Sequence, residues 1–184
     1  MITNFTAVEP GIISDFENGA SDKNSFINTL KKREILSVNT FEIIDYILTQ
    51  GNENSEMTIF SAEGEILAGA DGEGLTFEWI DFEAEGGARY LMYDPAVYKN
   101  KEDLDKAVKL SLSVGLGDFE KHFDIAKMID KGVFAADDEE YVKTNKSEII
   151  EAAFEDFVKI RKFYADALNA GKNVILFYLY DDEI

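Results

Sequence analysis

The chain has 184 residues, of which 46% are hydrophobic, so it holds enough apolar material for a folded core and is not a disordered segment. Its 37 acidic and 18 basic residues give a formal net charge of -19, which disfavours binding to nucleic-acid phosphates and to anionic membranes. Cysteine is absent, which excludes disulfides, thiolate nucleophiles and cysteine-ligated metal centres.

The first residues of the chain are not typical of a signal peptide. Residues 1–19 lack the basic region and the long apolar region of a signal peptide. No apolar run approaches the roughly 20 residues that a membrane-spanning helix needs. We therefore expect a cytoplasmic protein that does not contact a membrane. Since no linker separates two cores, we expect a single domain over residues 1–184.

The first 51 residues alternate extended and helical patterns. Residues 1–8 predict a short strand or an extended lead-in, residues 9–19 a helical turn and residues 21–34 a short amphipathic helix. The clearest early helix is predicted over residues 39–51. Asn39 is placed to cap it, and Glu42 follows at the spacing of a capping box. One face of this helix is apolar and carries Phe41, Ile44, Ile47 and Leu48.

The next segment is rich in carboxylates and glycines. Residues 51–100 contain eleven acidic side chains and only two basic ones, Arg89 and Lys99, and so carry nine of the 19 net negative charges. Short strands or extended segments are predicted within it at residues 56–60, 64–69 and 75–83, between turns, and residues 88–93 predict a further strand.

The second half is mainly helical. Helices are predicted over residues 100–114, capped by Asn100, and over two short pieces within 117–134, the second capped by Asp124. An acidic link at 135–141 precedes a long amphipathic helix over 145–172, and the apolar run 173–180 predicts a strand buried on both faces. The predicted class is α+β, with short strands in the first half, helices mainly in the second, a long penultimate helix and a C-terminal core strand.

No coherent catalytic set emerges from these residues. His122 is the only histidine, which excludes two-histidine metal sites, and no GxSxG nucleophile elbow is present. We interpret His122 as a helix residue. The sequence therefore predicts no catalytic residue, no metal ligand and no cofactor.

The stretch "EAEGGARYLMYDP" contains the most suggestive small-ligand candidates. It lacks the GK[ST] ending of a P-loop, so it does not predict a phosphate-binding loop. Arg89 is suited to hold an anionic group bidentately, with Tyr90 and Asp94 beside it. The favoured alternative is that Arg89 forms a structural ion pair with Glu83, Glu85 or another carboxylate.

Taken in order, several segments resemble those of the YfbM-like family, domain of unknown function 1877. The segments that carry the resemblance are "MITNFTAVEPGII", "ILSVNTFEIIDYILTQG", "GGARYLMYDPAVY", "HFDIAKMIDKGVF" and "FEDFVKIRKFYADALNAGKNVILFYL". The chain departs from the family pattern where Phe41 replaces a tryptophan, Asp45 a histidine, and Gly87 and Ile125 a proline each. The resemblance implies a compact α+β fold and no established catalytic residues.

The acidity and the lack of a catalytic set favour a non-enzymatic binding protein, similar to an immunity protein or inhibitor, that engages a basic protein partner such as a toxin or nuclease. One alternative is an enzyme or small-ligand protein with a cleft near Arg89, and a weaker one is a nucleic-acid mimic. The predicted partner contacts are Glu83, Glu85, Asp137, Asp138, Glu139 and Glu140.

Overall fold

The computed structural model describes residues 2–61, 64–76, 78–81, 88–91 and 95–181. Contacts along the chain divide it into two compact units. The first contains Met1–Asn39, Gly64–Leu104 and Asp166–Ile184, and the second contains Thr40–Glu63 and Asp105–Ala165. The single domain over residues 1–184 stays a prediction.

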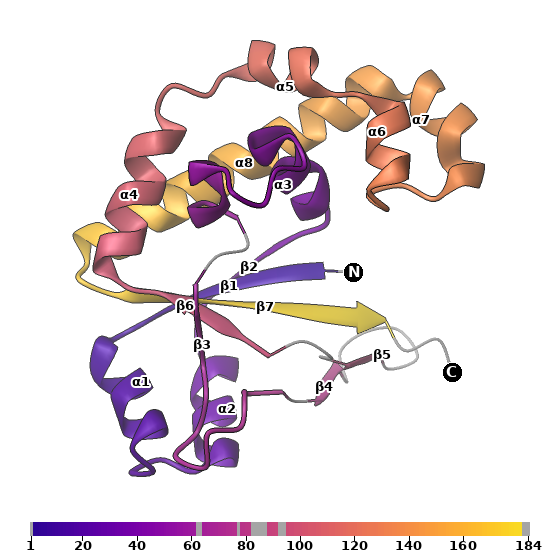
Figure 1. Cartoon of the computed structure of the whole chain (residues 1–184). Helices are drawn as coiled ribbons and strands as arrows, with labels where there is room; N and C mark the ends of the chain where they lie inside the picture. Colours follow the sequence, from indigo (N-terminus) through magenta and orange to yellow (C-terminus); the bar gives the residue numbers. More distant parts are fainter. Residues whose placement is uncertain (1, 62–63, 77, 82–87, 92–94, 182–184) are drawn as a thin grey trace. The chain divides into compact units, whose positions relative to one another are not determined.

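The first unit contains an antiparallel sheet (Figure 1). Its main path runs in the order β2-β1-β7-β5-β4; in addition, β6 pairs with β7 and β3 pairs with β6. The last strand along the chain is central, because β7 pairs with β1, β5 and β6. The strand bounds are β1 (Ile2–Val8), β2 (Ile35–Val38), β3 (Glu65–Ile66), β4 (Glu78–Asp81), β5 (Ala88–Leu91), β6 (Val97–Lys99) and β7 (Asn173–Asp181).

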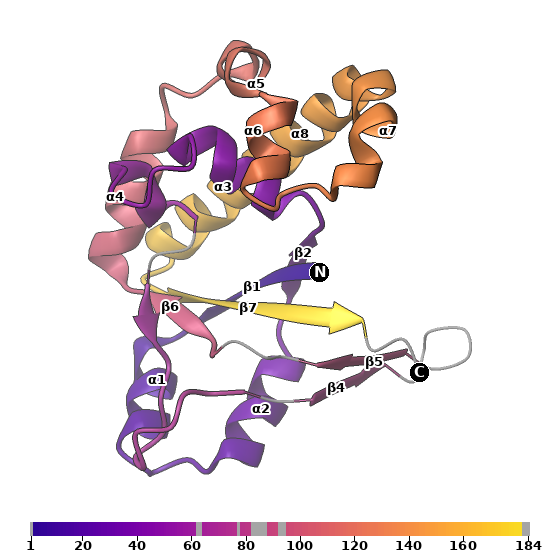
Figure 2. The same cartoon turned by 45° about the vertical axis from the view of Figure 1, so that its right-hand side comes forward.

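Two helices, α1 (Pro10–Glu17) and α2 (Lys23–Lys31), cover one face of this sheet (Figures 1 and 2). Alternate residues of β7, among them Phe177, face this side and share a buried apolar core with both helices. The rings of Phe16 and Phe26 stack there with centroids 4.5 Å apart. Asp22 caps α2, because its Oδ1 accepts a hydrogen bond from the Ser25 backbone N–H at 3.0 Å.

The second unit is helical and has an aromatic core. Phe60, Phe119, Phe157 and Tyr164 are buried in it, and the Tyr164 hydroxyl donates to the Phe60 carbonyl at 3.0 Å. The elements that lie wholly within this unit are α3 (Phe41–Thr49), η1 (Glu56–Ile59), α5 (Leu116–His122), α6 (Ile125–Asp130), η2 (Ala136–Asp138) and α7 (Glu139–Thr144). The helices α4 (Lys101–Ser111) and α8 (Lys146–Asn169) each have one end in the first unit.

The predicted α+β class is confirmed, including the long penultimate helix α8 and the C-terminal core strand β7. Two predicted caps are also confirmed. Asn100 Oδ1 accepts from the backbone N–H groups of Glu102 and Asp103, at 2.8 and 3.1 Å. Asp124 Oδ1 accepts from the Lys127 N–H at 3.2 Å.

Three local predictions are wrong. The segment 56–60, predicted as extended, begins with the 3-10 helix η1 (Glu56–Ile59), which the Ser55 hydroxyl oxygen caps by accepting from the Met57 N–H. The acidic link over 135–141 is helical, as η2 and the start of α7. The cap of α3 is Thr40 rather than Asn39, and its hydroxyl donates to Asp156 Oδ2 at 2.9 Å instead of capping the helix.

Candidate functional site: an acidic surface on the first unit

The residues predicted for a small-ligand site fall only partly in the described chain. Arg89 and Tyr90 lie in β5, where their backbones pair with Ile80 and Trp79 of β4. This confirms the predicted strand, while the side chains of Arg89 and Tyr90 lie outside what the structure describes. Asp94 lies outside the described residues, as do the predicted partner contacts Glu83 and Glu85. The cleft near Arg89 therefore stays a prediction.

The other predicted partner contacts belong to the second unit. Asp137 and Asp138 lie in η2, Glu139 and Glu140 begin α7, and all four are exposed. Carboxylates at this position are favourable, because the first turn of a helix carries partial positive charge. Lys143 Nζ lies 2.6 Å from Glu139 Oε1, and this hydrogen bond raises the pKa of Lys143.

A longer acidic stretch extends over both units. Between residues 34 and 88 the sequence contains 13 carboxylates and no lysine or arginine. In the described part of the first unit, four of these side chains are exposed and none forms an ion pair: Glu34, Glu65, Asp71 and Glu73. The absence of basic residues between positions 34 and 88 is visible in the sequence. The sequence alone does not show that the carboxylates of this stretch belong to two units of the fold.

Glu65 of β3 is held by neutral donors. Its Oε2 accepts from the Tyr98 hydroxyl at 2.7 Å, and its Oε1 accepts from the Asn100 amide at 3.2 Å. Burial raises the pKa of Tyr98 above its ordinary value, and the hydrogen bond to Glu65 and the nearby Glu17 raise it further. The hydroxyl therefore stays protonated, and the charge of Glu65 is fixed in place without being neutralised by a cation.

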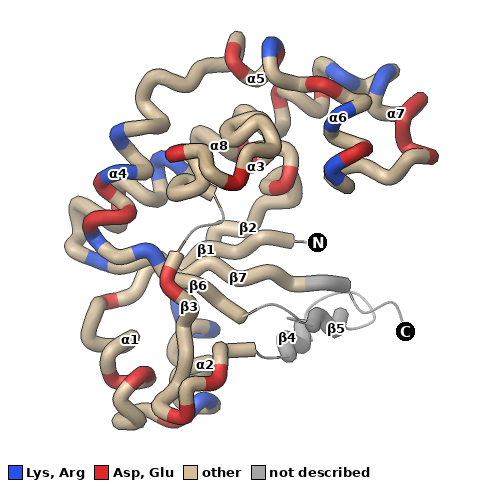
Figure 3. Tube along the Cα trace, in the orientation of Figure 1, with Lys and Arg blue, Asp and Glu red and all other residues tan. Residues whose placement is uncertain are grey.

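A tight turn presents the next two carboxylates. Ala68 and Gly74 form an isolated β-bridge, and Gly72, with φ of 79°, donates its backbone N–H to the Gly69 carbonyl at 2.9 Å. Asp71 Oδ1 accepts from the Glu73 N–H at 3.0 Å. This local bonding keeps both carboxylates exposed, and Figure 3 shows the acidic positions along β3 and the turn that follows it.

An apolar spot lies beside these charges. Ile66 is 62% exposed, although it is a large aliphatic residue in a strand. A Cβ atom built at Gly74 would lie 2.7 Å from Pro95 Cβ and 3.6 Å from Ile66 Cγ2, so these three residues adjoin one another. Pro95 is also exposed. We call this region the Ile66 surface, and it consists of Glu65, Ile66, Asp71, Glu73, Gly74 and Pro95.

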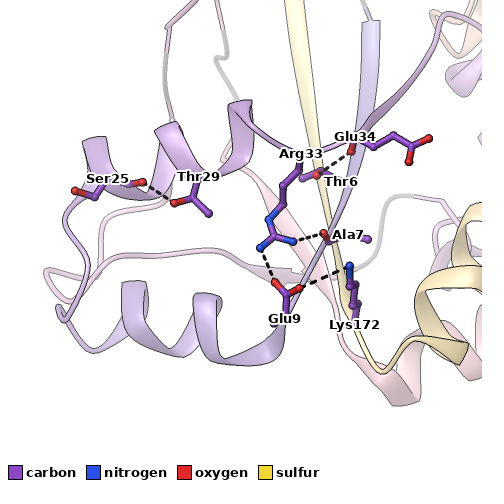
Figure 4. Close-up of polar contacts among 8 residues, drawn as sticks. All are labelled: Thr6, Ala7, Glu9, Ser25, Thr29, Arg33, Glu34 and Lys172. Atoms are coloured by element: carbon purple, nitrogen blue, oxygen red, sulfur yellow. Dashed lines mark hydrogen bonds and ion pairs between the residues drawn. The ribbon is translucent and has the colours of Figure 1, made fainter.

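Two basic side chains of the first unit, Arg33 and Lys172, form ion pairs with Glu9. Arg33 Nη2 lies 2.5 Å from Glu9 Oε2, and Lys172 Nζ lies 3.6 Å from Glu9 Oε1 (Figure 4). Arg33 Nη1 also donates to the Ala7 carbonyl at 3.3 Å. The hydrogen bond from Arg33 lowers the pKa of Glu9. Sequence reasoning missed this cluster, because Glu9 and Arg33 are 24 residues apart and nothing in their local patterns links them.

A family model described as a domain of unknown function, DUF1877, matches residues 1–177. The chain belongs to the DUF1877 family. A solved structure titled as a protein of unknown function, YfbM from Escherichia coli, is similar to this chain with a TM-score of 0.65. The two share 14% sequence identity, and the match covers 96% of this chain and 99% of that one. No curated protein matches the sequence. The DUF1877 relationship and the YfbM likeness support the fold and identify no activity.

Asp45, which stands where the resemblance to the family places a histidine, has a hydrogen-bond partner. The hydroxyl of Ser61, which is fully buried, donates to Asp45 Oδ1. His122 ends α5 and is partly exposed. Within the described ranges, no group of three or more histidines and carboxylates is arranged to hold a metal ion, and none of the helices there is both long and apolar enough to cross a membrane.

Proposed function

We propose that this DUF1877 protein is a non-enzymatic binding protein that engages a basic protein partner, in the manner of an immunity protein or an inhibitor. The observation that carries the proposal is the Ile66 surface. Its three carboxylates are exposed, they form no ion pair within the described chain, and they adjoin an exposed isoleucine. The same proposal includes the cytoplasmic location expected from the sequence.

The charge distribution supports fast association with a basic partner. A net charge of -19 attracts a cationic protein over about one Debye length, roughly 8 Å at physiological ionic strength. Such steering raises the association rate constant more than it lowers the dissociation rate. Final affinity then depends on desolvated contacts, which an apolar residue such as Ile66 supplies better than carboxylates alone.

The Asp137–Glu140 run is the second predicted contact, and it ranks below the Ile66 surface. Glu139 is already engaged by Lys143, and the dipole of α7 offsets part of the remaining negative charge. Within the described chain the carboxylates of the Ile66 surface form no ion pair, and the side chains that donate to Glu65, those of Tyr98 and Asn100, are neutral.

The test is affinity capture with matched variants. The native chain is immobilised and exposed to a lysate of its source organism at low and at physiological salt, and retained proteins are identified by mass spectrometry. One double variant, Asp71→Asn with Glu73→Gln, removes two charges, while the amide oxygen introduced at position 71 can still accept the bond that closes the turn. The control, Glu151→Gln with Glu155→Gln, removes two exposed charges of α8 in the second unit.

We expect one basic protein to be retained by the native chain and by the α8 control, and to be lost or strongly reduced with the turn variant. Equal retention by both variants, or retention of no basic protein at either salt concentration, would overturn the proposal. Retention of a DNA-binding protein that free DNA displaces would instead favour the nucleic-acid mimic.

A further inference from the structure

We propose that the Ile66 surface binds an extended basic segment that carries one apolar side chain between its lysines or arginines. The inference rests on the proposed function and specifies the chemistry of the partner. It begins from the position of β3 in the sheet. Glu65 and Ile66 pair with Tyr98 and Val97 of β6, and β3 pairs with no second strand among those that the structure describes.

Ile66 is the natural anchor for such a segment. Its exposed fraction of 62% leaves most of the side chain available to be buried by a partner. The Pro95 ring fills the space where a Gly74 side chain would stand, so this ring and Ile66 adjoin each other on the surface. One apolar side chain of an extended segment can therefore be buried against Ile66 and the Pro95 ring.

The carboxylates of the Ile66 surface determine the sign of the charge that a partner must carry. Glu65 is held in place by Tyr98 and Asn100, and Asp71 and Glu73 are presented by the glycine turn. A lysine or arginine on either side of an apolar residue would meet these charges. A second copy of this chain is disfavoured as the occupant, because two copies of the same surface would place like charges against each other.

The experiment uses two fluorescein-labelled peptides, Lys-Gly-Lys-Leu-Lys-Gly-Lys and Lys-Gly-Lys-Ser-Lys-Gly-Lys, which carry the same charge and differ only at the central residue. Binding to the full chain is measured by fluorescence anisotropy at low salt. The variants are Ile66→Thr, which keeps a β-branched residue in the strand, and Tyr141→Gln, which removes a 65% exposed apolar residue beside the Asp137–Glu140 run. Thermal unfolding confirms that both variants fold.

We expect the native chain to bind the leucine peptide about fivefold more tightly than the serine peptide, which is the effect of burying about 40 Å² of apolar surface. This preference should fall below about twofold in Ile66→Thr and persist in Tyr141→Gln. Equal binding of the two peptides by the native chain would overturn the inference and leave the proposed function standing. A preference lost in Tyr141→Gln but kept in Ile66→Thr would place the anchor on α7 and also overturn it. Failure of both peptides to bind would count against the inference and the proposed function together.

Discussion

The Nη2 atom of Arg33 donates a hydrogen bond to Oε2 of Glu9 at 2.5 Å, and this pair joins the end of β1 to the end of α2. The same guanidinium donates to the Ala7 carbonyl, while its Nε is buried and has no partner among the described residues. Arg33, which follows α2, therefore binds the segment that precedes α1, through Ala7 and Glu9.

Replacing Arg33 with methionine should destabilise the protein by about 1–2 kcal/mol, because two hydrogen bonds are lost while the unpartnered Nε is removed as well. The free energy of unfolding is measured by urea denaturation. Lys32→Met is the matched control, since Lys32 is exposed and its loss should change stability by no more than about 0.5 kcal/mol. Equal effects of the two substitutions would contradict the role assigned to Arg33.

The stabilising effect of Arg33 should also depend on pH. The pKa of Glu9 is lowered in the folded protein, so the contribution of the pair is fully present above the unfolded pKa of a glutamate, about 4.3. It is lost as the pH falls through the lower folded pKa. The stability difference between the native chain and Arg33→Met should therefore shrink between pH 7 and pH 3. A difference that stays constant over this range would show that the carboxylate is not the partner that matters.

Lys99 is fully buried at the end of β6, opposite Val174 of β7, and its side chain is not without an interaction partner. Removing the charged amine in Lys99→Met should break the interaction that this buried lysine makes and cost about 1–3 kcal/mol. Lys101→Met, two residues on and exposed, should be nearly neutral. Chemical denaturation of both variants decides this, and a stabilised Lys99→Met would mean that the lysine is retained for a reason other than stability.

Gly74→Ala tests the close approach at the Ile66 surface. The added Cβ would lie 2.7 Å from Pro95 Cβ and 2.8 Å from Pro95 Cγ, and the rigid proline ring cannot move aside without shifting its backbone. We expect a loss of about 1–3 kcal/mol, the usual range for overpacking. Gly11→Ala in α1 has open space around its Cβ and should be neutral or slightly stabilising. A drop in melting temperature for Gly11→Ala alone would contradict this assignment.

Phe157 is the centre of the aromatic core of the second unit. Its ring lies 5.0 Å from that of Phe60, 5.4 Å from Phe119 and 6.0 Å from Phe154, as centroid distances. Phe157→Ala should cost about 3–5 kcal/mol, because a large cavity remains. Val158→Ala, on the next position of α8 and 37% exposed, should cost about 1 kcal/mol or less. Similar unfolding midpoints for the two variants would refute the central role of Phe157.

The long helices and the last strand could be predicted from the sequence because their apolar periodicity extends over many residues. In α8 this pattern persists for 24 residues, and in β7 a continuous apolar run is flanked by polar residues. The strands β2 and β6 were not predicted, because four and three residues are too few for a period to become visible. Their pairing with β1 and β7 decides their conformation.

The candidate site was predictable only in part. The acidity of residues 51–100 was evident, but the apolar spot depends on Ile66, Gly74 and Pro95 being adjacent in space. The charge run at Asp137–Glu140 was correctly expected to be exposed, and it was wrongly interpreted as a link because consecutive acidic residues also suit the first turn of a helix.

The position of β7 sets an order on the assembly of the first unit. β1 pairs along its whole length with β7, from Ile2 opposite Leu179 to Val8 opposite Asn173. During synthesis on the ribosome, β1 therefore cannot pair with β7 until nearly the whole chain has been made. Until then β1 has an unpaired edge, and a nascent chain released before residue 173 would lack the strand that β1, β5 and β6 share.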